Sequence, residues 1–376
     1  MRLFPIKKRS RSVGLQTCAT AQRSVIPPLR IAGNTAEMCL YRQLREAVPV
    51  IDAAVLKLIR LLGEFRVVCE DESAQSMMDC FAARVQVGAA NTGLNSFVCA
   101  YFDQLLTYGT AVGEIVAYSD GDIAALYNVP LDAVELREGD DPLELKIYSR
   151  GGVKEAEHPE LILTTLLNPE PGTIRGCSIL KGLPFVSEIL MKIFDCVGQN
   201  FERAGNVRFA VTYNPPAGAS AVNASRRAKE IADEWSRAMR DKGRVCDFVS
   251  VGDVSIKAIG ADSQILDCDI PVRHILEQIV AKLSVPPFLL GLSWSSTERM
   301  SAQQADILTS ELDYYRSLLT PVIEKIARVY LDSVGCDPGV RVEWSNISLQ
   351  DETQLAQARL DNARAAQIEQ TLEVKG

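Results

Sequence analysis

The chain has 376 residues, of which 47% are hydrophobic and 23% are charged, enough apolar material for a sizeable core and for two or three structural units. No segment approaches the roughly 18 consecutive apolar residues of a membrane-spanning helix, and the start MRLFPIKKRSRS lacks the apolar region of a secretory signal. Residues 1–30 carry +7 and the whole chain −8, so residues 31–376 carry −15. A body this acidic argues against the basic groove of an ordinary nucleic-acid binder.

Residues that could support chemistry are few and scattered. The ten cysteines stand at least eleven positions apart, which excludes the paired spacing of a zinc site and favours buried, free thiols in a reducing compartment. No GxSxG, GxxxxGK[ST] or GxGxxG pattern occurs, so the nucleophile elbow, the P-loop and the dinucleotide fingerprint are missing. His158 and His274 could each act as a base in principle, but surface or interface packing explains them better.

Acidic pairs are the remaining candidates for a metal site. Turn formation and helix capping explain these pairs better than metal binding does. The pairs are Asp120 with Asp122, Asp140 with Asp141, and Asp267 with Asp269. The sequence therefore predicts no catalytic residue, no metal and no cofactor.

The first part of the chain is predicted to be mixed α+β. Residues 1–34 form a basic flexible tail, and an apolar period from Glu37 to Leu62 predicts a helix bent by Pro49. A short strand at 65–69 follows. A further helix between Gly93 and Tyr108 is expected to bury one face, made of Phe97, Tyr101, Leu105 and Leu106.

Strands follow that helix. AVGEIVAY and IAALYNV are expected to form a hairpin around the turn SDGD at 119–122. The segments 134–136, 143–148 and 161–167 are also predicted to be strands.

From Pro184 a long helix is predicted to end at Gly205, because apolar residues repeat there at steps of three and four. Its length is on the order of 31 Å. A polar insertion follows, with a loop at 214–222, a helix at 228–240 and the two short strands CDFVSV and VSIKAI.

The remaining segments are helical. A helix that Asp269 can cap ends before Val285, and a capping box, Ser301-x-x-Gln304, predicts where the longest helix begins. That helix should be kinked by Pro321 and should reach Gly335. Its apolar face is predicted to include Ile307 and Leu308. A weakly apolar amphipathic helix is expected near 351–372.

Three patches and the order of the elements resemble the portal proteins of tailed bacteriophages. The patches are YGTAVGEIV at 108–116, NPEPGTIRGCSIL at 168–180 and SVPPFLLGL at 284–292, the last joined to the kinked helix that follows. In the second patch, a Gly and a Ser stand ahead of an apolar pair. By element order the likeness covers roughly residues 35–350. The short stretch after residue 292, with its bulky Trp294, departs from the commonest form of the family.

The resemblance implies an α+β portal fold with a wing, a long helical stem, a small clip and a C-terminal helical crown, assembled as a cyclic ring of about twelve copies. It implies no enzymatic activity. The implied divisions are the wing at 35–183, a stem helix at 184–204, the clip at 205–268, a second stem helix at 269–285, a tunnel-loop region at 286–300, a long kinked wing helix at 301–335, and a wing strand and crown helix at 336–376.

The resemblance also implies partners and a location. The ring would sit at the portal vertex of the virion, and in the host cytoplasm during assembly. It would pass double-stranded viral DNA, dock the terminase and then the head–tail adaptor, and contact the major capsid and scaffolding proteins. The basic tail could touch capsid, scaffold or DNA, or could be a solubilising arm. No membrane partner is expected.

Two sets of residues are implied as sites. The DNA-facing tunnel loop comprises Ser293, Trp294, Ser295, Ser296, Thr297, Glu298 and Arg299. The loop could grip DNA or only line the bore. The clip surface for terminase and adaptor comprises Arg226, Arg227, Lys229, Arg237, Arg240, Lys242 and Arg244.

Two other classes of protein fit parts of this pattern. One is another structural virion protein such as a head–tail connector, although these are usually much shorter. The other is an unrecognised cytosolic enzyme, which the missing catalytic motifs disfavour. A ring with a central hole would exclude the enzyme, and retention of DNA inside capsids would distinguish a portal from an adaptor.

Overall fold

The structure is a computed structural model. It describes residues 33–118, 121–139, 141, 145–149, 154–205, 208–214, 221–240, 253–259, 268–292, 298–336 and 339–347. The chain divides into two compact units. Unit 1 is built from Met1–Ser187 and Leu276–Gly376, and unit 2 is Glu188–Ile275.

Unit 1 is a layered α+β body. Its first half contains α1 (Gly33–Ala47), α2 (Pro49–Leu61), β1 (Phe65–Cys69), α3 (Glu72–Arg84), β2 (Gln86–Val87), β3 (Asn91–Thr92), α4 (Leu94–Tyr108), β4 (Thr110–Ala117), β5 (Ile123–Asn128), β6 (Val134–Glu138), β7 (Leu145–Ser149), η1 (Pro159–Leu161) and β8 (Ile162–Leu166). After unit 2 it continues with most of α7 (Asp269–Leu283), then η2 (Pro287–Leu290), α8 (Glu298–Ser333) and β11 (Val340–Trp344).

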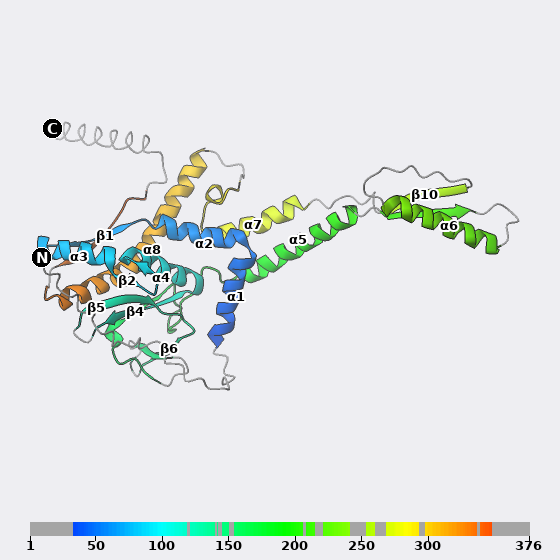
Figure 1. The fold of residues 1–376 in the computed structure, drawn as a ribbon. Helices are drawn as coiled ribbons and strands as arrows, with labels where there is room; N and C mark the ends of the chain where they lie inside the picture. Colours follow the sequence, from blue (N-terminus) through cyan, green and yellow to red (C-terminus); the bar gives the residue numbers. More distant parts are fainter. Residues whose placement is uncertain are drawn as a thin grey trace, which may run out of the picture. The chain divides into compact units, whose positions relative to one another are not determined.

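The centre of unit 1 is a five-stranded sheet with the order β3-β2-β5-β4-β8. β4 pairs antiparallel with both β5 and β8, so it is the central strand of the antiparallel part. Figure 1 shows α4 along one face of β4 and β5, with β6 on the other side. On that second face, Val112 of β4 clusters with Val129 and with Ile147 of β7.

α4 is the most deeply buried helix of the sheet layer. Phe97, Tyr101, Leu105 and Leu106 are all fully buried, as the predicted apolar face required. Gly113 of β4 lies directly under Phe97, where a Cβ atom would stand 2.7 Å from the ring. Gly109 ends the helix in the left-handed conformation and donates its N–H to Leu105 O at 2.8 Å.

A second layer of unit 1 joins distant parts of the chain. β1 pairs antiparallel with β11, and Phe65 lies opposite Trp344 with the ring centroids 5.1 Å apart. α3 contributes Phe81, which stacks on Tyr330 of α8 at 4.0 Å. Strand β11 thus brings the segment that follows α8 alongside β1.

Unit 2 contains most of α5 (Leu183–Gly205), an antiparallel strand pair and α6 (Ala221–Arg240). The strands are β9 (Arg208–Asn214) and β10 (Asp253–Ile259), with Asp253 opposite Asn214. The predicted strand VSIKAI is confirmed as β10. The predicted strand at 246–251 lies outside the described residues.

The structure corrects two predicted element boundaries, the start of α6 in unit 2 and the start of α8. The loop predicted at 214–222 is wrong at its end, because α6 begins at Ala221. The first turns of α6 consist mostly of small and polar residues, so their sequence lacks the apolar repeat that predicts a helix. α8 begins at Glu298, so Ser301 lies inside the helix and is not its N-cap. The same helix contains Pro321.

Two burial predictions are also corrected. Ile307 was assigned to the buried face of α8, yet it is 65% exposed while its neighbour Leu308 is fully buried. Adjacent residues lie about 100° apart on a helix, so one narrow contact does not cover both. The cysteines were expected to be buried, but Cys39, Cys80 and Cys196 are exposed; the eight described cysteines are free.

Candidate functional site

α5 carries several large apolar side chains that the described residues leave uncovered. Leu183 and Leu190 are buried, but other apolar side chains of the same helix face solvent. The exposed set is Phe185, Ile189, Met191, Phe194 and Phe201, with Phe185 at 71% and Phe201 at 58%. Apolar surface of this size along one helix indicates a contact with another molecule.

The start of α5 is fixed by a close crossing of two backbones within unit 1. Gly109 follows α4, and Gly176 lies ahead of α5. A Cβ atom on Gly176 would stand 1.7 Å from Gly109 O, and one on Gly109 would stand 2.6 Å from Cys177 C. Cys177 N donates to Leu167 O at 2.6 Å, and Leu167 N to Gly109 O at 2.8 Å. Two of the patches that resemble portal proteins therefore meet at this crossing.

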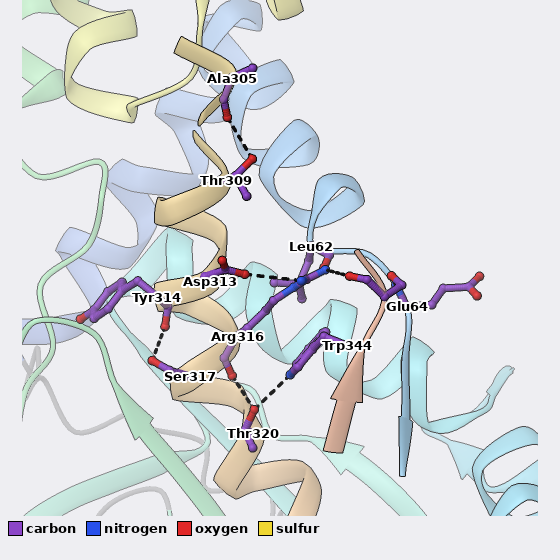
Figure 2. A network of polar contacts seen from close by, with 11 residues as sticks. Leu62, Glu64, Ala305, Thr309, Asp313, Tyr314, Arg316, Ser317, Thr320 and Trp344 are labelled. Atoms are coloured by element: carbon purple, nitrogen blue, oxygen red, sulfur yellow. Dashed lines mark hydrogen bonds and ion pairs between the residues drawn. The ribbon is translucent and has the colours of Figure 1, made fainter. Parts of the chain in front are cut away.

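Arg316 connects α8 to the far end of α2 and to the strand β11 (Figure 2). Its side chain is nearly buried, and Nε and Nη2 donate to Leu62 O at 2.9 and 2.7 Å. Nη2 also donates to Ser345 O at 2.8 Å. Asp313 lies 3.5 Å from Nη1, and the Trp344 ring lies 5.2 Å from the guanidinium. Burial lowers the pKa of Arg316.

The predicted clip residues fall in three groups. Arg226, Arg227 and Lys229 lie on α6 and are exposed, and both arginines pair with Glu230, at 3.7 and 3.4 Å. Arg237 and Arg240 lie further along α6, where only the backbone is described. Lys242 and Arg244 lie outside the described residues. α6 therefore brings at least its first three basic residues onto one short stretch of helix.

The predicted tunnel loop is only partly described. Residues 293–297, which include Trp294, lie outside the described part of the chain. Glu298 and Arg299 form the first turn of α8, so placing them in a loop was wrong.

The absence of chemistry can be stated only for what the structure describes. Within those residues, no three His, Cys, Asp or Glu side chains come together in a way that could hold a metal ion. None of the described helices combines the length and apolar character that a bilayer-spanning helix needs. His158 Nδ1 lies 2.9 Å from Glu160 Oε1 on an exposed loop.

Sequence reasoning did not identify Arg316, nor Ser178, whose Oγ donates to Thr107 O at 2.7 Å at the end of α4. The guanidinium bonds a carbonyl 254 residues away, which no local pattern can indicate. For Ser178 a signal existed, since the second patch places Gly and Ser ahead of an apolar pair.

No family model matches the sequence, and no curated protein matches it. Solved structures do resemble the fold. A chain from the neck of an empty gene transfer agent (GTA) particle, computed with C6 symmetry, has a TM-score of 0.62 at 16% identity, covering 87% of this chain and 88% of that one. A chain from the neck of a native GTA particle, computed with C12 symmetry, has a TM-score of 0.60 at 15% identity, covering 86% and 87%.

A HK97 family phage portal protein from Corynebacterium diphtheriae has a TM-score of 0.40 at 14% identity, covering 72% of this chain and 84% of that one. A TM-score of 0.40 is too low to support a conclusion. The two GTA structures show that the chain has the fold of a chain in a particle neck, because they match most of the chain in both directions.

Proposed function

We propose that the chain is a portal protein, which forms a ring at one vertex of a capsid and lets double-stranded viral DNA pass during packaging and ejection. The observation that carries the proposal is the fold shared with chains of a particle neck, one of them computed with C12 symmetry. That symmetry supports a ring of about twelve copies. The ring would belong to the virion and would assemble in the host cytoplasm.

The exposed apolar side chains of α5 support assembly through the stem. In a cyclic ring every subunit offers one face to the next, so a face that is exposed on one copy is covered by its neighbour. Burying large apolar side chains stabilises such a contact by about 1.5–3 kcal/mol for each fully buried residue. At about 100° per residue, Phe194 and Phe201 lie near one side of α5 and Phe185 lies on the opposite side, so both sides of the helix have apolar side chains for a neighbour to cover.

The charge of the chain supports passage of DNA without a tight grip. Residues 31–376 carry −15, and acidic residues that face a channel repel phosphates. DNA could then slide without a deep binding well. Trp294 in the loop and Arg299 in the first turn of α8 would give a weak, repeated contact inside this wall. The function would be passage and gating with no covalent chemistry, and a head–tail connector remains the second candidate.

Purified protein is expected to form rings of about twelve copies. The double variant Phe185→Glu, Phe201→Glu should yield folded monomers. Both side chains are exposed in the single chain, so the charges would be buried only in the ring. The matched control is Gln199→Glu, which adds charge at an exposed position on the polar side of α5. Light scattering and negative-stain images provide the measurement. A stable wild-type monomer at micromolar concentration would contradict the portal function.

The clip is expected to dock the terminase and then the adaptor through its basic residues. Reversing charge at Arg226 and Lys229 should leave rings intact and weaken terminase binding about tenfold or more, because charges of one sign steer a complementary partner. Arg84→Glu, at an exposed position of unit 1, is the control. Binding of the purified terminase to preformed rings is the readout, and unchanged affinity would refute this role of α6.

A further inference from the structure

Ser178 binds the last turn of α4 through its side chain. Its Oγ donates toward Thr107 O at 2.7 Å and Leu106 O at 3.3 Å, and accepts from Leu180 N at 2.9 Å. The residue is 4% exposed. The carbonyls at the end of a helix have no partner within the helix, so the hydroxyl and Ile179 N, which donates to Leu106 O at 3.3 Å, together cap α4.

The capped segment leads directly into α5. Leu180 and Leu183 are buried, and Leu183 N donates to Leu180 O at 3.0 Å. Upstream, the crossing of Gly109 and Gly176 holds the backbone two residues before Ser178. The first turn of α5 therefore begins from a segment whose polar atoms bond the end of α4.

The same turn of α4 is bound from its other side by Arg45 of α1. Arg45 Nη1 donates to Thr107 Oγ1 at 2.7 Å and to Asp103 Oδ1 at 2.6 Å. Its Nη2 pairs with Asp52 of α2 at 2.7 Å. Thr107 thus accepts from Arg45 with its hydroxyl and from Ser178 with its carbonyl. A continuous series of hydrogen bonds runs from α2 through α1 and α4 to the start of α5.

We infer that Ser178 is a positioning residue, which fixes the start of α5 to the C-terminal end of α4. The inference rests on the proposed function only in taking α5 to be the stem helix of a ring. Without the hydroxyl, Thr107 O and Leu180 N would lose their partners inside a buried junction, and the start of α5 would open more often.

Hydrogen exchange of the purified full chain tests this inference. Ser178→Ala should accelerate exchange of the α5 amides at residues 187–191 by about ten- to a hundredfold, because unsatisfied buried groups favour the opened state. Exchange of the central α4 amides at 98–104 should be unchanged. The matched control is Ser187→Ala on α5, since this serine is equally buried at 3% and its Oγ has no hydrogen-bond partner among the described residues.

Two outcomes would overturn the inference. One is normal exchange at 187–191 in Ser178→Ala; the other is equal acceleration in α4 and α5, which would make Ser178 a general stabiliser. If Ser178→Ala does not fold, Ser178→Cys provides the same test, because a thiol of similar size is only a weak hydrogen-bonding group. Unchanged exchange in that variant would also refute it.

A second arm of the experiment separates this inference from the proposed function. Rings of Ser178→Ala should assemble but retain less nuclease-protected DNA per head than rings of Ser187→Ala. If the wild-type chain forms no rings but Ser178→Ala still accelerates exchange at 187–191, the positioning role stands and the portal function is refuted. Normal DNA retention by Ser178→Ala together with accelerated exchange would show that Ser178 holds the start of α5 but that this does not affect the passage of DNA. That result would overturn the link between Ser178 and the stem.

Discussion

Gly176→Ala is expected to lower the free energy of unfolding of unit 1 by more than about 3 kcal/mol, the upper end of the cost of overpacking a core. A Cβ atom there would meet Gly109 O at 1.7 Å, and Leu167 N at 2.7 Å. Both neighbours are backbone atoms, and Leu167 N donates to that same oxygen. No side-chain rotation can relieve the overlap, so the crossing itself must separate.

The matched control lies four residues earlier in the same loop. Gly172 has a φ of +76° and open space where a Cβ atom would stand, so Gly172→Ala should cost only the strain of the left-handed backbone, about 1–2 kcal/mol. Denaturant unfolding of the two variants beside wild type measures the difference. Equal losses of stability would mean that the two backbones do not approach closely at Gly176.

The parts of this fold that could be predicted are those in which apolar residues follow a regular local pattern along the sequence. α4 was predicted with its buried face because Phe97, Tyr101 and Leu105 recur at helical spacing and are all buried. The hairpin of β4 and β5 was predicted from the SDGD turn between two apolar runs, and the antiparallel pairing confirms it. In both cases the residues whose burial stabilises the element lie close together in the sequence.

α3 was not predicted, because its buried side is sparse. Only Ala74, Met78 and Phe81 are buried along its 13 residues, and the remainder is mostly small or polar. Its start is set by Asp71, whose carboxylate accepts from Ala74 N at 2.9 Å. Such a cap is visible in a sequence only once a helix is already expected there.

The candidate site was predictable to a smaller extent than the fold. A chain's basic residues can be counted from the sequence, and three of those assigned to the clip do lie exposed on α6. The crossing at Gly176, by contrast, depends on two segments 67 positions apart that approach only in the folded chain. The sequence marks such places by residue type alone, as it did with the Gly and Ser of the second patch.

Arg316→Met is expected to lower the free energy of unfolding of unit 1 by about 2–6 kcal/mol, because two carbonyls lose their donors at a cost of about 1–3 kcal/mol each. Methionine would retain the apolar stem of the side chain but leave Leu62 O and Ser345 O without the donors that now lie 2.7–2.9 Å away. The residue that follows β11 would then lose its hydrogen bond to α8, while Trp344 Nε1 of β11 would still donate to Thr320 Oγ1 at 3.1 Å (Figure 2).

Arg316→Lys should recover little of that loss. Two nitrogens of the planar guanidinium reach Leu62 O while one of them also reaches Ser345 O, and a single ammonium cannot reproduce this fork. The control is Arg328→Met on the same helix, where the side chain is 64% exposed and pairs with Glu324 at 3.2 Å, so the change should stay below about 0.5 kcal/mol. Denaturant midpoints of the three variants give the comparison. If Arg316→Met costs no more than Arg328→Met, water replaces the guanidinium at both carbonyls, and Arg316 does not hold the end of α2 and β11 to α8.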